Sequence, residues 1–147
     1  MMPERLDLLP CWFTMDALRE DAMKRDMDLV REILLDAESL EHGYVNGVLK
    51  IDGYTEDQIG HHVYLMEQAG LVEAADASSM DSDSPIALLI SIKWQGHDFL
   101  DSVRDPEIWK QTKDIAERAG GYSIALLGDL AKGLIKTQIK RITGVDV

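Results

Sequence analysis

The sequence predicts an α+β fold that is mainly helical, and three observations lead to this prediction. Apolar residues recur at helical spacing after Met27. A second helix, over residues 55–69, runs directly into two strand-like stretches, residues 71–75 and 86–92. Helical segments then follow one another from Trp94 onward. This order is that of a winged helix-turn-helix-like domain with a small β-hairpin wing and two additional C-terminal helices.

The elements before the central helix are one helix and one short strand. The helix is expected to begin at Met27 and to end near Gly43, and Asp26 and Asp28 are placed to favour the positive end of its dipole. Residues 48–51 lie between glycines and are rich in β-prone side chains, so they predict a short first strand. The apolar positions of the helix share one face: Met27, Val30, Leu34 and Ala37.

The central helix is the best specified element, because side-chain chemistry indicates both of its ends. Thr55 and Gln58 have the spacing of a capping box, and Tyr54 precedes the cap as one half of a hydrophobic staple with Ile59. Gly70 suits the left-handed residue of a Schellman motif. A helix of about thirteen residues is therefore expected between these signals.

The outward face of the central helix is the candidate binding face, since winged-helix folds place their DNA-reading helix at this point. Ile59, Val63 and Met66 are expected to be buried, with His62 beside them. The remaining positions carry no Lys or Arg, although a DNA-reading helix needs cations near phosphates. The candidate face consists of Asp57, His61, Tyr64, Glu67 and Gln68.

The wing is expected to be a mobile acidic loop between the two predicted hairpin strands. Its tip, residues 76–85, is rich in Ser and Asp and includes Asp76, Asp81 and Asp83. Three carboxylates at the tip would repel a phosphate backbone. The wing, like the helix before it, is therefore poorly suited to DNA.

The C-terminal part predicts three further helices. The first begins at Trp94; the second begins at Asp105-Pro106-Glu107, where Asp caps, Pro fits the first helical position and Glu favours the dipole. Gly120-Gly121 ends the second helix, and Ser123 caps the last. The last helix has an apolar face large enough to predict homodimerisation. It also carries the one cationic stripe, the candidate phosphate or partner contacts Lys132, Lys136, Lys140 and Arg141.

Three segments follow from these elements. Residues 1–22 are an N-terminal extension, either disordered or the product of a misassigned translation start, and they hold the single cysteine, Cys11. Residues 23–104 form the winged-helix-like core. Residues 105–147 form a helical extension that packs on the core or makes a dimer interface.

Composition and charge limit the possible functions. The chain has 147 residues and a formal net charge of −12. Residues 1–102 hold 7 Lys/Arg against 21 Asp/Glu, a balance of −14, whereas residues 103–147 hold 8 against 6. A strongly acidic front part disfavours nucleic acid as the partner. No membrane span or secretory signal is present in the sequence, so a cytoplasmic location is expected.

No arrangement of residues predicts catalysis or a bound cofactor, so the protein is expected not to be an enzyme. The sequence contains no nucleophile elbow, Cys/His pair or glycine-rich phosphate loop. A zinc site built from His61, His97 and a carboxylate is one alternative, against the expectation that His62 and His97 flank the core with backbone partners. The aromatic residues Trp94, Phe99 and Trp109 could stack on bases, but without interleaved cations they are expected to pack within the fold.

Three stretches give the chain a resemblance to a known family. They are residues 23–31 (MKRDMDLVR), residues 53–59 (GYTEDQI) with residues 69–73 (AGLVE), and residues 94–101 (WQGHDFLD). With these motifs, residues 23 to about 142 resemble a family of uncharacterised bacterial and phage proteins, a domain of unknown function. The resemblance implies a winged-helix-like fold and an association with mobile elements, and it implies no activity or catalytic residue.

These observations leave three hypotheses about function. The first is a non-enzymatic winged-helix regulator that binds a macromolecule; if this is DNA, His61, Tyr64 and Gln68 would face the bases and the cationic stripe would hold the phosphates. The second is an acidic protein-interaction module, or a decoy that mimics nucleic acid. The third is a metal-dependent enzyme.

Overall fold

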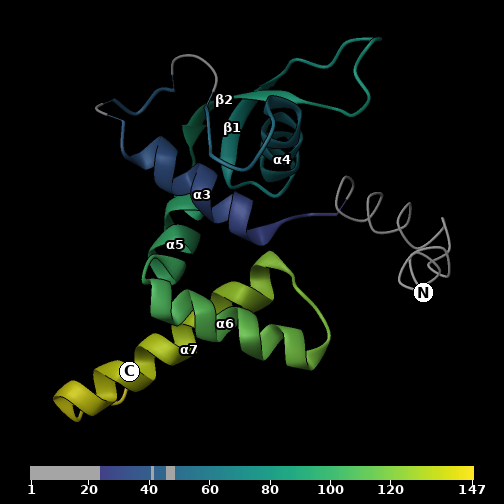
Figure 1. Ribbon diagram of the computed structural model, residues 1–147. Helices are drawn as coiled ribbons and strands as arrows, with labels where there is room; N and C mark the ends of the chain where they lie inside the picture. The colour runs from purple at the N-terminus through teal and green to yellow at the C-terminus, as the bar shows by residue number, and fades with distance from the viewer. Residues whose placement is uncertain (1–23, 41, 46–48) are drawn as a thin grey trace, which may run out of the picture.

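The computed structural model describes residues 24–40, 42–45 and 49–147, and the predicted extension at residues 1–22, with Cys11, lies outside them. The predicted α+β, mainly helical fold is confirmed in the described part, where helices and one hairpin have a winged-helix-like arrangement (Figure 1). The elements are α3 (Met27–Glu38), α4 (Glu56–Gln68), β1 (Val72–Asp76), β2 (Ala87–Ile92), α5 (Trp94–Val103), α6 (Pro106–Ala119) and α7 (Ile124–Thr143).

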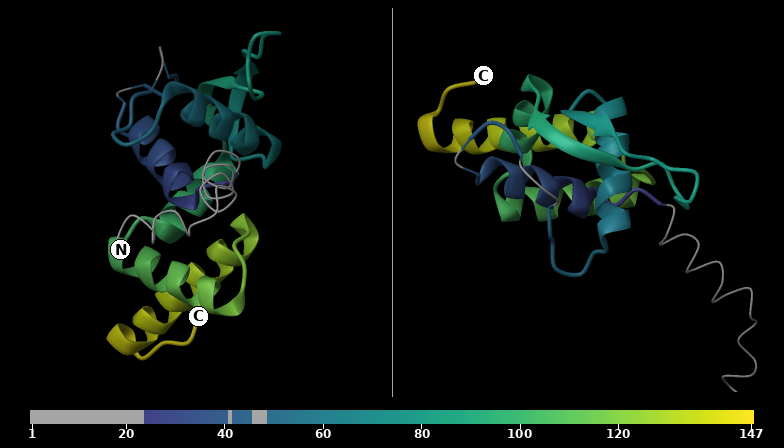
Figure 2. Two further views of the ribbon diagram at one scale, coloured as in Figure 1. Left: turned by 45° about the vertical axis from the view of Figure 1, so that its right-hand side comes forward. Right: turned by 90° about the horizontal axis from the view of Figure 1, so that it is seen from above.

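The described elements lie in two groups joined by α5. At one end, α3 and α4 pack beside the β1–β2 hairpin, and at the other end α6 lies against α7 (Figures 1 and 2). The core runs through both groups, because buried apolar side chains come from every helix and from both strands. None of the described helices combines the length and apolar character needed to cross a bilayer.

The first helix is shorter than predicted, and the predicted first strand is wrong for its described residues. Helix α3 ends at Glu38, not near Gly43, and its C-cap Ser39 bonds through its backbone N–H and its hydroxyl to carbonyls of the last turn. Residues 49–51 are not in a strand, and residue 48 lies outside the described part. A backbone bond from Val45 N to Ile90 O, at 2.9 Å, reaches the edge of β2 instead.

Both ends of α4 are confirmed as predicted. The capping box is complete, with Gln58 N donating to Thr55 Oγ1 at 3.1 Å and Thr55 N donating to Gln58 Oε1 at 2.9 Å. At the other end Gly70 has φ +78°. The two Schellman bonds, Gly70 N to Glu67 O and Leu71 N to Met66 O, both measure 3.0 Å. Thus α4 leads into the hairpin through a fixed turn.

The hairpin is antiparallel and pairs Val72 with Ile92 at one end and Asp76 with Ala87 at the other. The register shifts between Glu73 and Ala74, which leaves Ile90 of β2 without a partner in β1 and bends β2 at that residue. The last hairpin residue is followed by Lys93, whose N–H donates to Leu71 O at 2.9 Å. This bond sets the start of α5 directly against the end of α4.

The C-terminal helices begin as predicted. Asp105 accepts from Glu107 N and Ile108 N ahead of Pro106, and Ser123 accepts from Leu126 N at 3.0 Å. Helix α6 packs on α3 as well as on α7, since the indole Nε1 of Trp109 donates to Asp28 Oδ1 at 2.8 Å. Part of the C-terminal extension is therefore joined to the core through a buried aromatic residue.

Candidate functional site

The predicted outward face of α4 is present, but its residues differ in what they do. Asp57, Glu67 and Gln68 are exposed. His61 and Tyr64 are half-buried, and their rings stack with centroids 6.4 Å apart. His61 Nδ1 also lies 2.8 Å from Pro85 O at the base of the wing. The two aromatic residues therefore support the joint between helix and hairpin, and the three exposed ones remain free for a partner.

The hairpin and its wing carry further exposed carboxylates. Asp76, Asp81 and Asp83 are exposed. Hydrogen bonding by Ser78, whose backbone N–H donates to Asp76 Oδ1 at 2.8 Å, lowers the pKa of Asp76. Residues 51–92 contain 8 Asp/Glu and no Lys or Arg, a balance of 0 − 8 = −8. We call the exposed carboxylates of α4 and the hairpin the acidic face: Glu56, Asp57, Glu67, Glu73, Asp76, Asp81 and Asp83.

An apolar cleft of about 220 Å³ lies beside the acidic face, between α4 and β2. Gly60 keeps the two elements close, since a Cβ at this position would lie 3.1 Å from Ile86 Cβ. Leu88 is 49% exposed at the cleft. The rim of the cleft carries Glu56 and Asp57, and its apolar lining comes from Leu49, Ile59, Val63, Ile86, Ala87, Leu88 and Leu89.

The cationic stripe lies apart from the acidic face. Lys132, Lys136, Lys140 and Arg141 are all exposed on α7, and Lys140 pairs with Asp146 at 3.1 Å. The C-terminal half of α7 points away from α4 and the hairpin (Figures 1 and 2). One copy of the chain therefore does not bring the two predicted groups of site residues into one surface.

His62 is held by backbone groups on both ring nitrogens, as predicted. Its Nε2 accepts from Asp26 N at 2.9 Å, so the ring proton is on Nδ1, which donates to Gln58 O at 2.8 Å. Asp26 in turn accepts from the Tyr54 hydroxyl at 2.9 Å. Burial is the main cause of a lowered pKa of His62, and burial together with the Asp26 carboxylate raises the pKa of Tyr54 to about 12. The neutral imidazole is thus a structural link between α3 and α4.

The predictions for His97 and Trp94 are wrong. His97 does not flank the core: its side chain is 49% exposed, with Nδ1 lying 3.9 Å from Glu38 Oε2. Trp94 is 79% exposed, because it occupies the first position of α5, away from the core. Phe99 and Trp109 are buried as predicted. In the described part of the chain, no group of three His, Cys, Asp or Glu side chains is placed to hold a metal ion, which leaves the zinc alternative without a site there.

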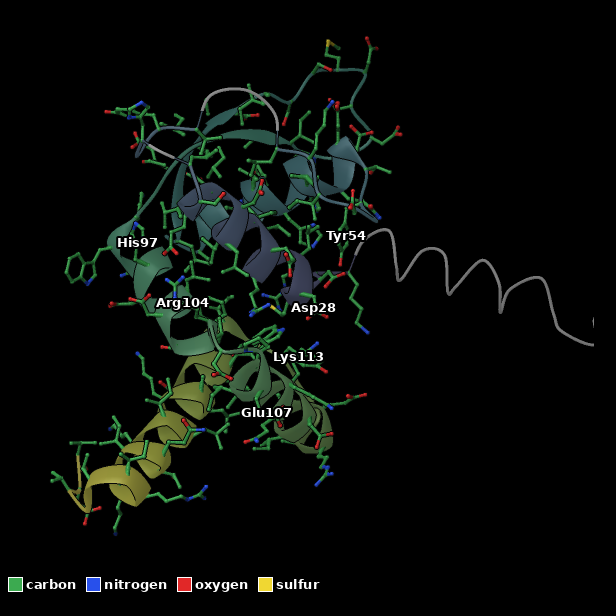
Figure 3. The ribbon with its side chains drawn as sticks, turned by 60° about the vertical axis from the view of Figure 1, so that its left-hand side comes forward. Asp28, Tyr54, His97, Arg104, Glu107 and Lys113 are labelled. Carbon is green, nitrogen blue, oxygen red and sulfur yellow. The ribbon has the colours of Figure 1, made fainter. Side chains whose placement is uncertain are left out.

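Sequence reasoning missed a polar cluster that joins α3 to α6. Asp28 Oδ1 accepts from Trp109 Nε1 at 2.8 Å and from Lys113 Nζ at 2.7 Å. Figure 3 shows Asp28 and Lys113 close to one another. Burial opposes ionisation of Asp28, but the hydrogen bonds from Lys113 and Trp109 and the Lys113 charge outweigh it and lower the pKa of Asp28. Trp109 and Lys113 are 81 and 85 residues from Asp28 in the sequence, so no local sequence pattern could have predicted the cluster.

The His62 link makes folding sensitive to pH. A histidine with a lowered pKa in the folded state takes up a proton first in the unfolded chain. We therefore expect the free energy of unfolding to fall as pH drops below the ordinary histidine value of 6.5. Protonated Nε2 can no longer accept from Asp26 N.

Urea denaturation between pH 7.5 and 5.5 measures this effect as the difference between wild type and His62→Gln. The wild type should lose stability over this range more steeply than His62→Gln. The matched control is His61→Gln, one residue away, which should keep the wild-type slope. Equal slopes for His62→Gln and the wild type would contradict the assignment.

Comparison with known proteins gives a family and one relative. A family model described as "Hypothetical protein (DUF2513)" matches residues 24–123. An uncharacterized protein of Haemophilus influenzae is 36% identical over 121 residues, which cover 80% of this chain and 99% of the relative. No solved structure matches the chain.

Proposed function

Because the chain belongs to the DUF2513 family of hypothetical proteins, which names no activity, we propose its function from the geometry of the site. We propose that it is a non-enzymatic, winged-helix-type protein that binds a basic partner protein through the acidic face. The observation that carries this proposal is the absence of Lys and Arg from residues 51–92, against eight Asp and Glu. A surface of one sign attracts a partner of the other sign and speeds its association.

The acidic face favours protein over DNA for an electrostatic reason. Binding to DNA gains free energy when protein cations displace counterions from phosphates, and α4 and the hairpin offer none. Carboxylates on a helix and on a wing instead repeat the negative charge of a phosphate backbone. The proposed role is therefore regulatory, in the cytoplasm: the protein would occupy the basic surface with which its partner holds nucleic acid.

DNA binding through α7 is the second candidate, and the cationic stripe favours it. Of its four cations, Lys132, Lys136 and Arg141 form no ion pair with any described residue. The stripe would contact the phosphates of DNA and not its bases, because α4, the helix expected to face the bases, lies on another part of the fold. A mobility-shift assay on fragments of the encoding genome at ~50 mM salt tests it. Binding at micromolar protein that Lys136→Glu abolishes would support DNA and count against the acidic face.

Charge reversal on α4 tests the protein-binding proposal. We expect affinity purification from host extract to recover a basic protein, and calorimetry with that purified protein to show that Glu67→Lys weakens binding by about 5-fold or more, the effect of roughly 1 kcal/mol. Asp57→Lys should act in the same direction. Both residues are exposed, so neither change should affect folding.

The matched control is Asp114→Lys on α6, which makes the same change of charge away from the acidic face. Its side chain is exposed and pairs with Arg118 at 3.1 Å, a contact of little energy. The control should bind the partner like the wild type. A partner that is indifferent to all three reversals, or weakened equally by all three, would overturn the proposal.

A further inference from the structure

The C-terminal half of α7 is amphipathic: Ile135 still packs against the core of the described fold, but the apolar side chains of the helix beyond it are exposed. In the first half of α7, Leu127, Gly128 and Ala131 are buried against the fold, and Gly128 approaches Phe99 of α5. Further along, Ile139 is 37% exposed and Ile142 is 80% exposed. This half of the helix projects away from α4 and the hairpin (Figures 1 and 2).

The exposed apolar residues continue the seam that is buried in the first half. Counted from Gly128, successive members lie three, four, four and three residues apart, which keeps them on one side of a helix. The seam therefore runs past the last residues that the fold covers. Its members are Gly128, Ala131, Ile135, Ile139 and Ile142.

Charge indicates what kind of surface would cover this seam. Residues 130–147 hold four Lys/Arg and one Asp, a balance of 4 − 1 = +3. Pairing α7 with α7 of a second copy would bring two such segments together, which is unfavourable. An apolar surface with an acidic rim is the complementary partner for an apolar helix with cationic flanks.

The α4–β2 cleft of the same chain has this character. Its lining is apolar, its rim carries Glu56 and Asp57, and Leu88 is half exposed beside it. A cavity of about 150 Å³ accommodates benzene, so the cleft of about 220 Å³ has room for an isoleucine side chain. Helix α4 and strand β2, whose residues line the cleft, lie at the opposite end of the described fold from the projecting half of α7 (Figure 1), so one copy cannot bring the two together without rearrangement.

We propose that the projecting half of α7 docks in the α4–β2 cleft of a second copy of this chain, with Ile142 entering the cleft and the cationic stripe lying along the acidic face. Each copy has one helix end and one cleft, so a two-fold arrangement satisfies both contacts and closes as a homodimer. The inference rests on the acidic face being a binding surface, as proposed above, but it requires no other protein. The docked helix would cover Asp57 and so compete with a basic partner.

Sedimentation equilibrium of the purified full chain tests the proposal, because it needs no partner. We expect dimers at tens of micromolar protein, with dissociation promoted by 0.5 M salt, which screens the attraction between stripe and rim. Ile142→Glu should weaken the dimer at least tenfold. It replaces an exposed side chain, and circular dichroism should show an unchanged fold.

A charge swap distinguishes the cleft from an α7–α7 contact. Glu56→Lys with Asp57→Lys, and separately Lys132→Glu with Lys136→Glu, should each weaken the dimer, and the combination of all four should restore it. Lys110→Glu, on an exposed position of α6, is the control and should leave the dimer unchanged. A monomer at tens of micromolar overturns the proposal, as does a dimer that the Glu56/Asp57 reversal leaves intact. Neither result affects binding of a basic protein, which calorimetry measures separately.

Discussion

Replacing Gly96 with alanine is expected to destabilise the protein by about 3 kcal/mol or more, because the new methyl group has nowhere to go. A Cβ at this position would collide with the carbonyl oxygen of Leu71 and would lie 2.7 Å from Ile92 Cγ2. The backbone of Leu71 cannot easily retreat. Its carbonyl accepts from Lys93 N at 2.9 Å, and its N–H completes the Schellman motif of α4 at 3.0 Å. The substitution is therefore expected to disrupt the packing where α4, the hairpin and α5 meet.

Urea denaturation measures the loss, and Gly133→Ala is the matched control. Gly133 lies in the exposed part of α7, where a Cβ would meet nothing within 4 Å. Alanine is a better helix former than glycine, so this control should raise stability by roughly 0.5–1 kcal/mol. Opposite signs for the same chemical change would show that close approach, not helix propensity, makes Gly96 necessary. A Gly96→Ala protein as stable as the wild type would refute this account.

The features that could be predicted from the sequence are those that short-range chemistry determines. The cap of α4 depends on Thr55 and Gln58, three residues apart, and its end depends on Gly70. The same holds for Asp105 and Ser123 at the starts of α6 and α7. At each of these helix starts a side chain bonds to a backbone N–H within three residues, and at the end of α4 the positive φ of Gly70 lets backbone groups close the last turn.

The features that could not be predicted depend on contacts distant in sequence. Whether residues 49–51 form a strand depends on the edge of β2, which offers a bond to Val45 instead. Whether a tryptophan is buried depends on which helix covers it: α3 lies on Trp109, while Trp94 begins a helix at its uncovered end. Hydrophobicity alone predicts burial equally for Trp94 and Trp109.

The candidate site shows the same division. The charge of the acidic face follows from composition along residues 51–92 and needed no coordinates. The separation of the cationic stripe from that face is a property of the path of α5, which turns the chain away from the hairpin before α6 and α7 (Figure 1). The position of the His61 ring depends on a hydrogen bond to Pro85 O, which lies in the wing, 24 residues away in the sequence.

Truncating Trp109 to alanine should cost about 3–5 kcal/mol, because it removes a buried aromatic side chain and leaves Asp28 without one of its donors. Trp109 is 4% exposed, and its Nε1 lies 2.8 Å from Asp28 Oδ1. Its ring also lies 5.5 Å from Lys113 Nζ and 6.0 Å from Arg31 Cζ, within the range of cation–π attraction.

Two further variants separate the contributions in the same denaturation experiment. Trp109→Phe keeps an aromatic ring but removes the N–H, so its loss should be a fraction of that for alanine, about 1–3 kcal/mol. Trp94→Ala removes the same side chain from a position that is 79% exposed and should change stability by less than about 0.5 kcal/mol. Equal losses at the two tryptophans would contradict the packing of α6 on α3. Because Trp109 binds the C-terminal helices to α3, its loss should also weaken the position of α7, and with it any contact that α7 makes to a second copy.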